Sequence, residues 1–166
     1  MKTNSKDSVS HTFGPIFDEN SRYLILGSMP SVKSRDMGFY YMHKQNRFWK
    51  VLSAVFNDDF EGSIEDKKAK LLKHNIALYD VIESCKIIGS SDVSIKDVVP
   101  ANKTIDEIIE NSKIEKIILN GSKAAKLFDK HFKKYDGIDV LYMPSTSPAN
   151  AKMNLEILVK SWINIK

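Results

Sequence analysis

The chain has 166 residues, of which 42% are hydrophobic and 28% charged, and its formal net charge is +4. This composition is typical of a single folded domain and excludes a disordered chain or a fibrous repeat. The one cysteine, Cys85, excludes an internal disulfide and any zinc or iron–sulfur site built from four cysteines, and we expect it to be a packing residue. The positive charge is compatible with nucleic-acid binding, although scattered lysines usually form only a solvated surface.

No stretch of the sequence approaches the roughly 20 apolar residues of a membrane span, and residues 1–20 contain no apolar signal-peptide core. We therefore predict a cytoplasmic protein without membrane association, and we expect a monomer. Residues 1–20 are predicted to be a loose N-terminal segment, and residues 21–166 a single domain.

Four short apolar runs, bounded by turn or polar residues, predict buried strands. In chain order they are residues 23–26, 76–81, 116–119 and 140–143. Segments with helical spacing of apolar residues lie between and after them, at residues 48–56, 63–72, 104–109, 124–128 and 153–165. Strands that alternate with helices predict an α/β fold, a three-layer α/β/α sandwich around a central four-stranded parallel sheet.

Two further features accompany these elements. Thr104 and Glu107 have the spacing of a capping box at the start of a helix. Residues 84–103 form the longest stretch without a clear period, and we expect them to form part of the site rim or a surface excursion.

The segments that follow the four predicted strands are the candidate site, because ligands of open parallel sheets bind beyond the carboxyl ends of the strands. After the first strand, residues 27–34 resemble a phosphate-binding loop, and Asp80 at the end of the second strand would suit a magnesium ion. However, Val32 replaces the glycine that such a loop needs before its lysine, and Pro30 removes a backbone N–H. A P-loop-like nucleotide hydrolase is therefore only an alternative.

Residues 38–49 contain the most unusual cluster of side chains in the sequence, with several aromatic residues beside a histidine, an asparagine and an arginine. Tyr40 and Tyr41 could stack on a flat base, and the amide of Asn46 could orient a water molecule. Alternatively, the aromatic residues at the end of this segment belong to a helix core, and Asn46 caps a helix that begins at Arg47. His43 is compatible with either a surface role or a site role.

Ser145, Thr146 and Ser147 lie between two prolines after the fourth predicted strand. Three hydroxyl groups in a stiff turn, with the positive charge of Lys152 beyond them, form a candidate binding site for a DNA phosphate. The alternative is an ordinary Ser/Thr turn ahead of a helix. This loop is expected at the same end of the sheet as residues 27–31. Two loops that bind the DNA backbone would therefore flank the aromatic pocket. That arrangement suits an enzyme that extrudes one nucleotide from a duplex.

Five segments together resemble the hypoxanthine-DNA glycosylase branch of the uracil-DNA glycosylase superfamily. They are LGSMPS (residues 26–31), FYYMHKQNRFW (39–49), LYDVIESC (78–85), LNGSKAAKLF (119–128) and PSTSPAN (144–150). The likeness extends over residues 12–163. It implies a four-stranded parallel sheet between helices, no metal or other cofactor, and hydrolytic removal of a deaminated base from DNA to leave an abasic site.

The resemblance also implies roles for particular residues. Asn46 would be the catalytic residue that holds the attacking water. Tyr40 or Tyr41 would stack on the base, and Asp80 and Ser84 would read its edge. His43 is a further candidate for base binding, from its own chemistry and not from the resemblance. DNA phosphates would be contacted by the second motif of the superfamily, here Ser145, Thr146, Ser147 and Pro148. The first motif supplies the other predicted DNA-binding loop, with Gly27, Ser28, Pro30 and Ser31, and the charge of Lys152 makes it a further candidate.

We therefore predict a monofunctional DNA glycosylase that flips a deaminated base, hypoxanthine first and uracil second, and attacks its glycosidic bond with water. Its expected partner is DNA that contains deaminated bases. No side-chain nucleophile is needed for this reaction. The alternative from another class is a catalytically silent damaged-DNA-binding module, and the presence of Asn46 in its full motif argues against it.

Overall fold

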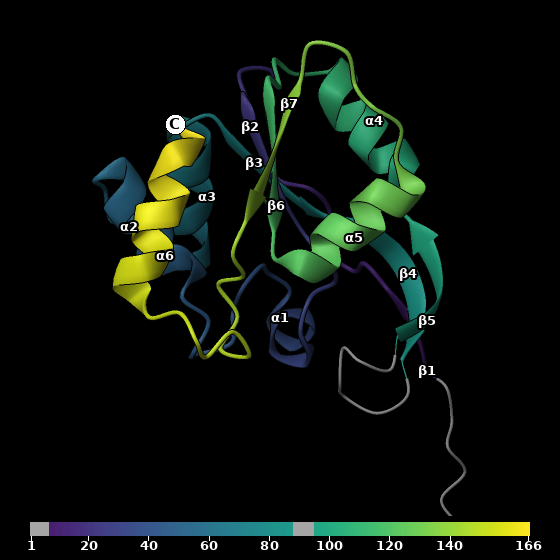
Figure 1. Cartoon of the computed structure of the whole chain (residues 1–166), viewed down its shortest axis with the longest axis horizontal. Coiled ribbons are helices and arrows are strands. Elements are labelled where there is room, and N and C mark those ends of the chain that lie inside the picture. Colours follow the sequence, from purple (N-terminus) through teal and green to yellow (C-terminus); the bar gives the residue numbers. More distant parts are fainter. Residues whose placement is uncertain (1–6, 88–94) are drawn as a thin grey trace, which may run out of the picture.

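A central parallel sheet organises the fold. The computed structural model describes residues 7–87 and 95–166, and Figure 1 shows the sheet between two groups of helices. Its strands run in the order β3 (Ile76–Asp80), β2 (Tyr23–Gly27), β6 (Lys116–Asn120) and β7 (Asp139–Met143), and every neighbouring pair is parallel. The first three strands are buried almost throughout, which explains their continuous apolar sequences. The predicted four-stranded parallel sheet is confirmed.

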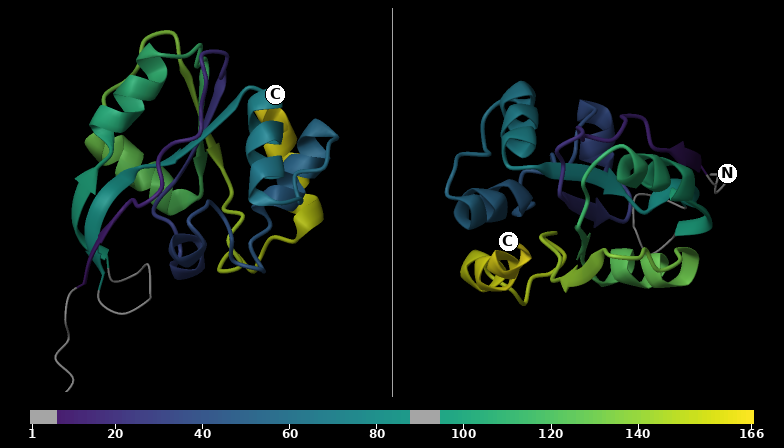
Figure 2. Two further views of the ribbon diagram at one scale, coloured as in Figure 1. Left: turned by 180° about the vertical axis from the view of Figure 1, so that it is seen from behind. Right: turned by 90° about the horizontal axis from the view of Figure 1, so that it is seen from above.

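Helices cover both faces of this sheet, as seen in Figure 1 and from above in Figure 2. One layer contains α2 (Phe48–Phe56), α3 (Ile64–Lys73) and α6 (Leu155–Trp162), which continues into the 3-10 helix η2 (Ile163–Ile165). The other layer contains α4 (Asn102–Glu110) and α5 (Ser122–His131). This arrangement confirms the three-layer α/β/α sandwich. Within the described ranges, no helix is both long and apolar enough to cross a membrane.

The start of α4 differs from its prediction. The capping box expected at Thr104 and Glu107 is wrong, because the helix begins earlier, directly after Ala101. The Ala101 N–H donates to Val81 O (2.8 Å), which ties this start to the end of β3. The Thr104 hydroxyl donates to the Glu83 carboxylate (3.3 Å), so it does not cap the helix.

A second, antiparallel sheet has no counterpart in the predicted elements. It contains β1 (Asp7–Ser10), β4 (Ile82–Ile87) and β5 (Ile95–Pro100) in the order β1-β4-β5, and it lies at the lower right of Figure 1. The stretch of residues 84–103, which was expected to form part of the site rim or a surface excursion, therefore contains strand and helix. Its residues 88–94 lie outside the described residues.

The expectation of a loose segment over residues 1–20 is wrong for residues 7–20, while residues 1–6 lie outside the described residues. Strand β1 pairs with β4 throughout its length. Farther along, Ile16 exchanges two backbone hydrogen bonds with Leu78 of β3 (3.1 and 2.9 Å). The N-terminal segment thus pairs with both sheets, and it is part of the folded structure.

The carboxyl ends of the four central strands meet at one edge of the sheet. Gly27 pairs with Asp80, and Asn120 pairs with Met143, so the ends are aligned. The short helix α1 (Val32–Met37) follows β2 and lies below this edge in Figure 1. The loop that follows β7 lies beyond the same edge. The chain therefore brings its motifs together where a parallel sheet is expected to bind a ligand.

Candidate active site

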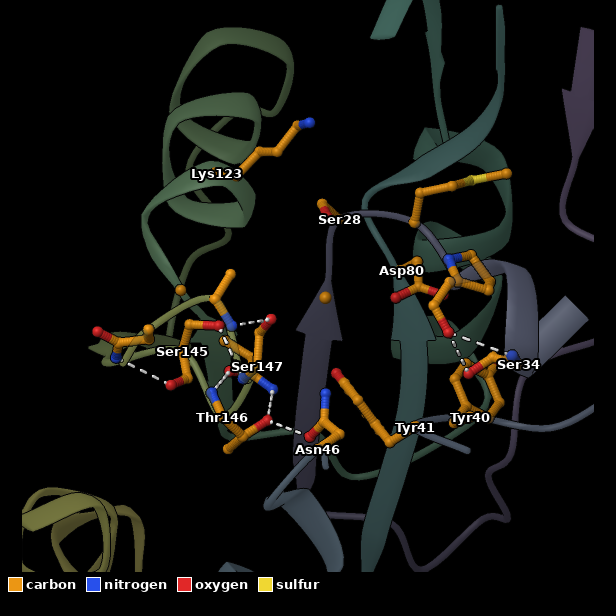
Figure 3. A pocket seen from close by; sticks show the side chains of 18 of the residues that line it. Ser28, Ser34, Tyr40, Tyr41, Asn46, Asp80, Lys123, Ser145, Thr146 and Ser147 are labelled. Atoms are coloured by element: carbon orange, nitrogen blue, oxygen red, sulfur yellow. Dashed lines mark hydrogen bonds between the residues drawn. The ribbon is translucent and has the colours of Figure 1, made fainter. Parts of the chain in front are cut away.

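A pocket of about 590 Å³ lies at this edge of the sheet, within the range of about 300–1,000 Å³ that is usual for small-molecule sites. Figure 3 shows it from close by. Residues from the four strand ends and from the segment before α2 line it. Of the predicted site residues, the pocket brings together Gly27, Ser28, Pro30, Ser31, Tyr40, Tyr41, Asn46, Asp80, Ser145, Thr146 and Ser147.

Gly27 has no side chain, which allows two polar groups to approach the end of β2. A Cβ atom at this position would lie 2.7 Å from Asp80 Oδ1 and 2.9 Å from the Tyr41 hydroxyl. Both distances are shorter than real Cβ contacts, so any other residue would displace one of these groups. Gly27 therefore keeps the Asp80 carboxylate and the Tyr41 hydroxyl together at the sheet end.

The orientation of the Asn46 amide follows from its partners. Its Oδ1 lies 3.0 Å from the Phe48 backbone nitrogen and 2.9 Å from Thr146 Oγ1. A backbone N–H can only donate, so the atom that faces it is the carbonyl oxygen, and the Thr146 hydroxyl donates to the same oxygen. Figure 3 shows the amide nitrogen on the other side, facing the pocket beside Tyr41. Asn46 therefore presents N–H donors to the pocket.

Thr146 and Asn120 fix this orientation from behind. The Thr146 N–H donates to Asn120 Oδ1 (3.1 Å), and Asn120 Nδ2 donates to Thr146 Oγ1 (3.2 Å). Thr146 is fully buried, and its hydroxyl has both a donor and an acceptor partner within the protein. The prediction that this hydroxyl grips a DNA phosphate is therefore wrong. Asn120 was not predicted, although it ends the third central strand in the chain, where the crevice is expected.

Tyr41 is the more exposed of the two pocket tyrosines. Its ring stacks on Phe48, with ring centroids 3.9 Å apart. Burial, together with the nearby Asp80 charge, raises the pKa of the Tyr41 hydroxyl well above its usual value, so the group is protonated at neutral pH. Within the described structure this buried hydroxyl makes no hydrogen bond of ordinary geometry, and the Asn120 side chain is a polar neighbour that acts on its pKa in the lowering direction. An unpaired donor beside a pocket is a candidate contact for a bound base.

Tyr40 is held in the protein core. It is 2% exposed, its hydroxyl donates to Gly14 O (3.0 Å), and its ring packs edge-on against Phe13. Tyr40 still lines the pocket, but these contacts fix its ring and occupy its hydroxyl. Phe48 and Trp49 are buried in α2, which confirms that they belong to a helix core.

Arg47 ties the loop after β7 to the start of α2. Its guanidinium donates to the carbonyl oxygens of Thr146 (3.3 Å), Ser147 (2.8 Å), Asn150 (3.2 Å) and Met153. Four acceptors thus converge on one planar group with five donors. Arg47 was not predicted as a site residue, because its partners lie 99 to 106 residues away in the sequence and no local pattern links them.

The hydroxyl groups of this loop also stabilise its turn. Ser145 Oγ accepts the Ser147 N–H (3.1 Å), and Ser147 Oγ accepts the Ala149 N–H (3.2 Å). The interpretation as a Ser/Thr turn is therefore confirmed. A hydroxyl that accepts a hydrogen bond still has its own hydrogen to donate, so contacts of Ser145 and Ser147 with DNA phosphates stay predictions.

Four predicted site residues do not line the pocket. His43 is exposed, and its Nδ1 accepts the Gln45 N–H (3.1 Å) within a turn. Ser84 lies in β4 of the antiparallel sheet. The predicted base contacts of His43 and Ser84 are wrong, because both side chains lie outside the pocket. Pro148 and Lys152 belong to the loop after β7, and their contacts with DNA stay predictions.

The sequence and the fold match one known family. The sequence profile of the uracil DNA glycosylase superfamily matches residues 15–166. The chain belongs to this superfamily. Membership confirms the family predicted from the five motifs. It also confirms the prediction of an enzyme, a DNA glycosylase, which hydrolyses N-glycosyl bonds in DNA.

Individual relatives of this glycosylase are similar over much of its length. A protein named hypoxanthine DNA glycosylase from Methanosarcina barkeri is 33% identical over 116 residues, which cover 69% of this chain and 72% of that protein. A second protein of that name, from Methanosarcina acetivorans, is 31% identical over 148 residues, or 88% and 91% of the two chains. The solution NMR structure of a candidate uracil DNA glycosylase from Methanosarcina acetivorans is similar with a TM-score of 0.72 and 30% sequence identity, covering 92% of this chain and 93% of that one.

Proposed function

We propose that this glycosylase removes hypoxanthine from DNA first and uracil second. The names of two relatives support hypoxanthine as the first substrate. The main observation behind the proposal is the orientation of the Asn46 amide. Its hydrogen bonds with Phe48 and Thr146 direct its N–H donors toward the pocket, which is large enough for a small ligand. The base leaves the duplex and enters this pocket, because enzymes cannot reach the target atoms of a stacked base.

Cleavage of the N-glycosidic bond separates charge, since the sugar becomes oxocarbenium-like and the base departs with negative charge. In the proposed mechanism, an Asn46 N–H donates to one lone pair of a water molecule and directs the other lone pair toward C1′. The water oxygen bonds to C1′ as the bond from C1′ to the base nitrogen breaks. The proton that the water loses balances the charge of the departing base. The protonated Tyr41 hydroxyl is a donor for that base, and the products are an abasic site and the free base.

The direct test is cleavage of labelled duplexes that carry one inosine or one uracil, with undamaged DNA as the control, followed by alkali to break abasic sites. We expect more alkali-labile product from inosine than from uracil and far less from undamaged DNA. Cleavage should persist in a strong chelator, because the proposed mechanism uses only protein groups and water. Binding of the damaged duplexes without cleavage would favour a silent binding module. Loss of cleavage in chelator and rescue by magnesium would show that the reaction needs a metal ion, and would contradict the proposed mechanism.

DNA binding is expected to weaken as salt rises. The proposed backbone contacts come from Lys152, from serine hydroxyls and from backbone N–H groups of the two loops. The logarithm of affinity should fall with the logarithm of salt concentration, with a slope of about one per phosphate contact. Fluorescence anisotropy with an inosine duplex at several salt concentrations measures this slope.

Two variants that each lose one positive charge test whether Lys152 contributes to the salt dependence of DNA binding. Lys152→Ala should reduce the slope by about one, because it removes one phosphate contact. Lys103→Ala removes the same charge from an exposed position in α4, away from the pocket edge, and should leave the slope unchanged. A flat salt response of the unaltered protein would contradict the proposed grip on the DNA backbone.

A further inference from the structure

A buried pair links the N-terminal segment to the pocket. His11 follows β1, and its Nε2 lies 2.7 Å from Asp80 Oδ2 at the end of β3. The His11 side chain is 1% exposed and the Asp80 side chain 5%. A carboxylate oxygen only accepts, so His11 Nε2 is the donor in either the neutral or the protonated ring. One of the two carboxylate oxygens of Asp80 is therefore occupied.

Packing holds the His11 ring in place. The ring stacks on Tyr79, with centroids 4.4 Å apart, and lies edge-on to Phe13 at 4.8 Å. The His11 backbone N–H donates to Glu83 O (2.8 Å), which anchors the main chain at the same point. The fold therefore sets the direction of the Nε2–H bond toward Asp80.

The other oxygen of Asp80 faces the pocket. Asp80 belongs to the pocket lining, and its Oδ1 lies beside Gly27, where a Cβ atom would be only 2.7 Å away. Figure 3 shows the Asp80 carboxylate across the pocket from Ser145 and Ser147. With Oδ2 held by His11, Oδ1 is a fixed acceptor inside the pocket.

We propose that His11 is a positioning residue for base recognition, which holds Asp80 so that Oδ1 accepts the ring N–H that deamination creates. The inference rests on the proposed function, since it names how the same pocket selects its base. Hypoxanthine carries N1–H where adenine has a lone pair, and uracil carries N3–H where cytosine has a lone pair. A fixed carboxylate oxygen attracts the N–H and repels the lone pair. The wrong base also leaves a buried polar group unpaired, which adds to the discrimination.

Two amide variants test whether the hydrogen bond from His11 matters. The amide nitrogen of His11→Gln can reach the position of the imidazole Nε2, whereas that of His11→Asn ends one bond short. Both variants lose the stacking on Tyr79, so their melting temperatures should fall alike. With enzyme in excess, we expect His11→Gln to cleave inosine DNA within a few-fold of the unaltered protein. His11→Asn should be about 10-fold to 100-fold slower, the range for one hydrogen bond to a charged group.

The second measurement is the selectivity for inosine over adenosine, which a purely structural role of His11 would leave unchanged. The ratio of inosine cleavage to adenosine cleavage should fall in His11→Asn and stay unchanged in His11→Gln. Equal cleavage by the two folded variants, whether fast or slow, would overturn the role of His11 and leave hypoxanthine removal by the unaltered protein intact. Absence of inosine cleavage by the unaltered protein would instead overturn the proposed function, and this inference with it.

The unaltered protein supplies a second test that does not depend on the folding of any variant. In DNA that carries 1-methylinosine, a methyl group replaces the hydrogen on N1. We expect cleavage to be slower than for inosine by at least about 10-fold, because Asp80 Oδ1 loses the hydrogen bond. Equal cleavage of the two bases would overturn the proposal, because it would show that Oδ1 does not receive this hydrogen.

Discussion

Asn46→Ala is expected to lower single-turnover cleavage of inosine DNA by about 100-fold or more, the scale of losing one positioned catalytic group. The contact between the held water and C1′ strengthens only as the glycosidic bond opens, so it stabilises the transition state more than the bound state. Affinity for inosine DNA should therefore stay within a few-fold. Cleavage with enzyme in excess and equilibrium binding to the same duplex measure the two effects separately.

Asn46→Ser separates catalysis from helix capping. The helix α2 begins at Phe48, one residue later than predicted, and Arg47 is its N-cap residue. Asn46 lies just before that cap, but its Oδ1 accepts the Phe48 N–H (3.0 Å), so a role in stabilising the start of α2 has a structural basis, and its loss would cost about 1 kcal/mol of stability. Serine can accept that N–H, but it has no amide N–H and reaches less far into the pocket. A serine variant that is folded and fully active would show that Asn46 is only a cap.

The central sheet was predictable because its strands are buried on both faces. Residues 76–80 are all buried, and such a strand shows a continuous apolar run. The antiparallel sheet gives a weaker signal. Residues 95–100 of β5 are intermediate or exposed, and their apolar and polar side chains do not alternate with a period of two. Register shifts between β4 and β5 also break the strict period of two. The fold of the N-terminal segment depends on this sheet, so it was missed as well.

The candidate site was predictable only where its residues share a local motif or end a predicted strand, as Asn46 and Asp80 do. His11 reaches Asp80 across 69 residues, and Arg47 reaches Met153 across 106. Periodicity and motif spacing carry no information on such distant pairs. His43 shows the opposite error, because it stands among pocket residues in the motif, yet its turn directs the side chain to solvent.

The carbonyl groups that meet at Arg47 explain why this residue should matter to both stability and catalysis. Three of them belong to Thr146, Ser147 and Asn150, in the loop that forms one wall of the pocket. The backbone of Thr146 thus lies between Arg47 and the hydroxyl that orients Asn46. Without the guanidinium, the loop loses the group that holds its carbonyls together, and the Asn46 amide loses a fixed partner.

Arg47→Met is therefore expected to lower the free energy of unfolding by about 2–4 kcal/mol, because several part-buried carbonyls lose a charged donor and water replaces it only in part. Single-turnover cleavage should fall by about 100-fold, the effect of displacing a catalytic group by about 1 Å. Urea denaturation and cleavage of inosine DNA below the denaturation range measure the two losses. Lys50→Met removes the same charge from an exposed position in α2 and should change stability by no more than about 0.5 kcal/mol. Equal losses in the two variants would show that net charge matters, and that the carbonyl contacts of Arg47 do not.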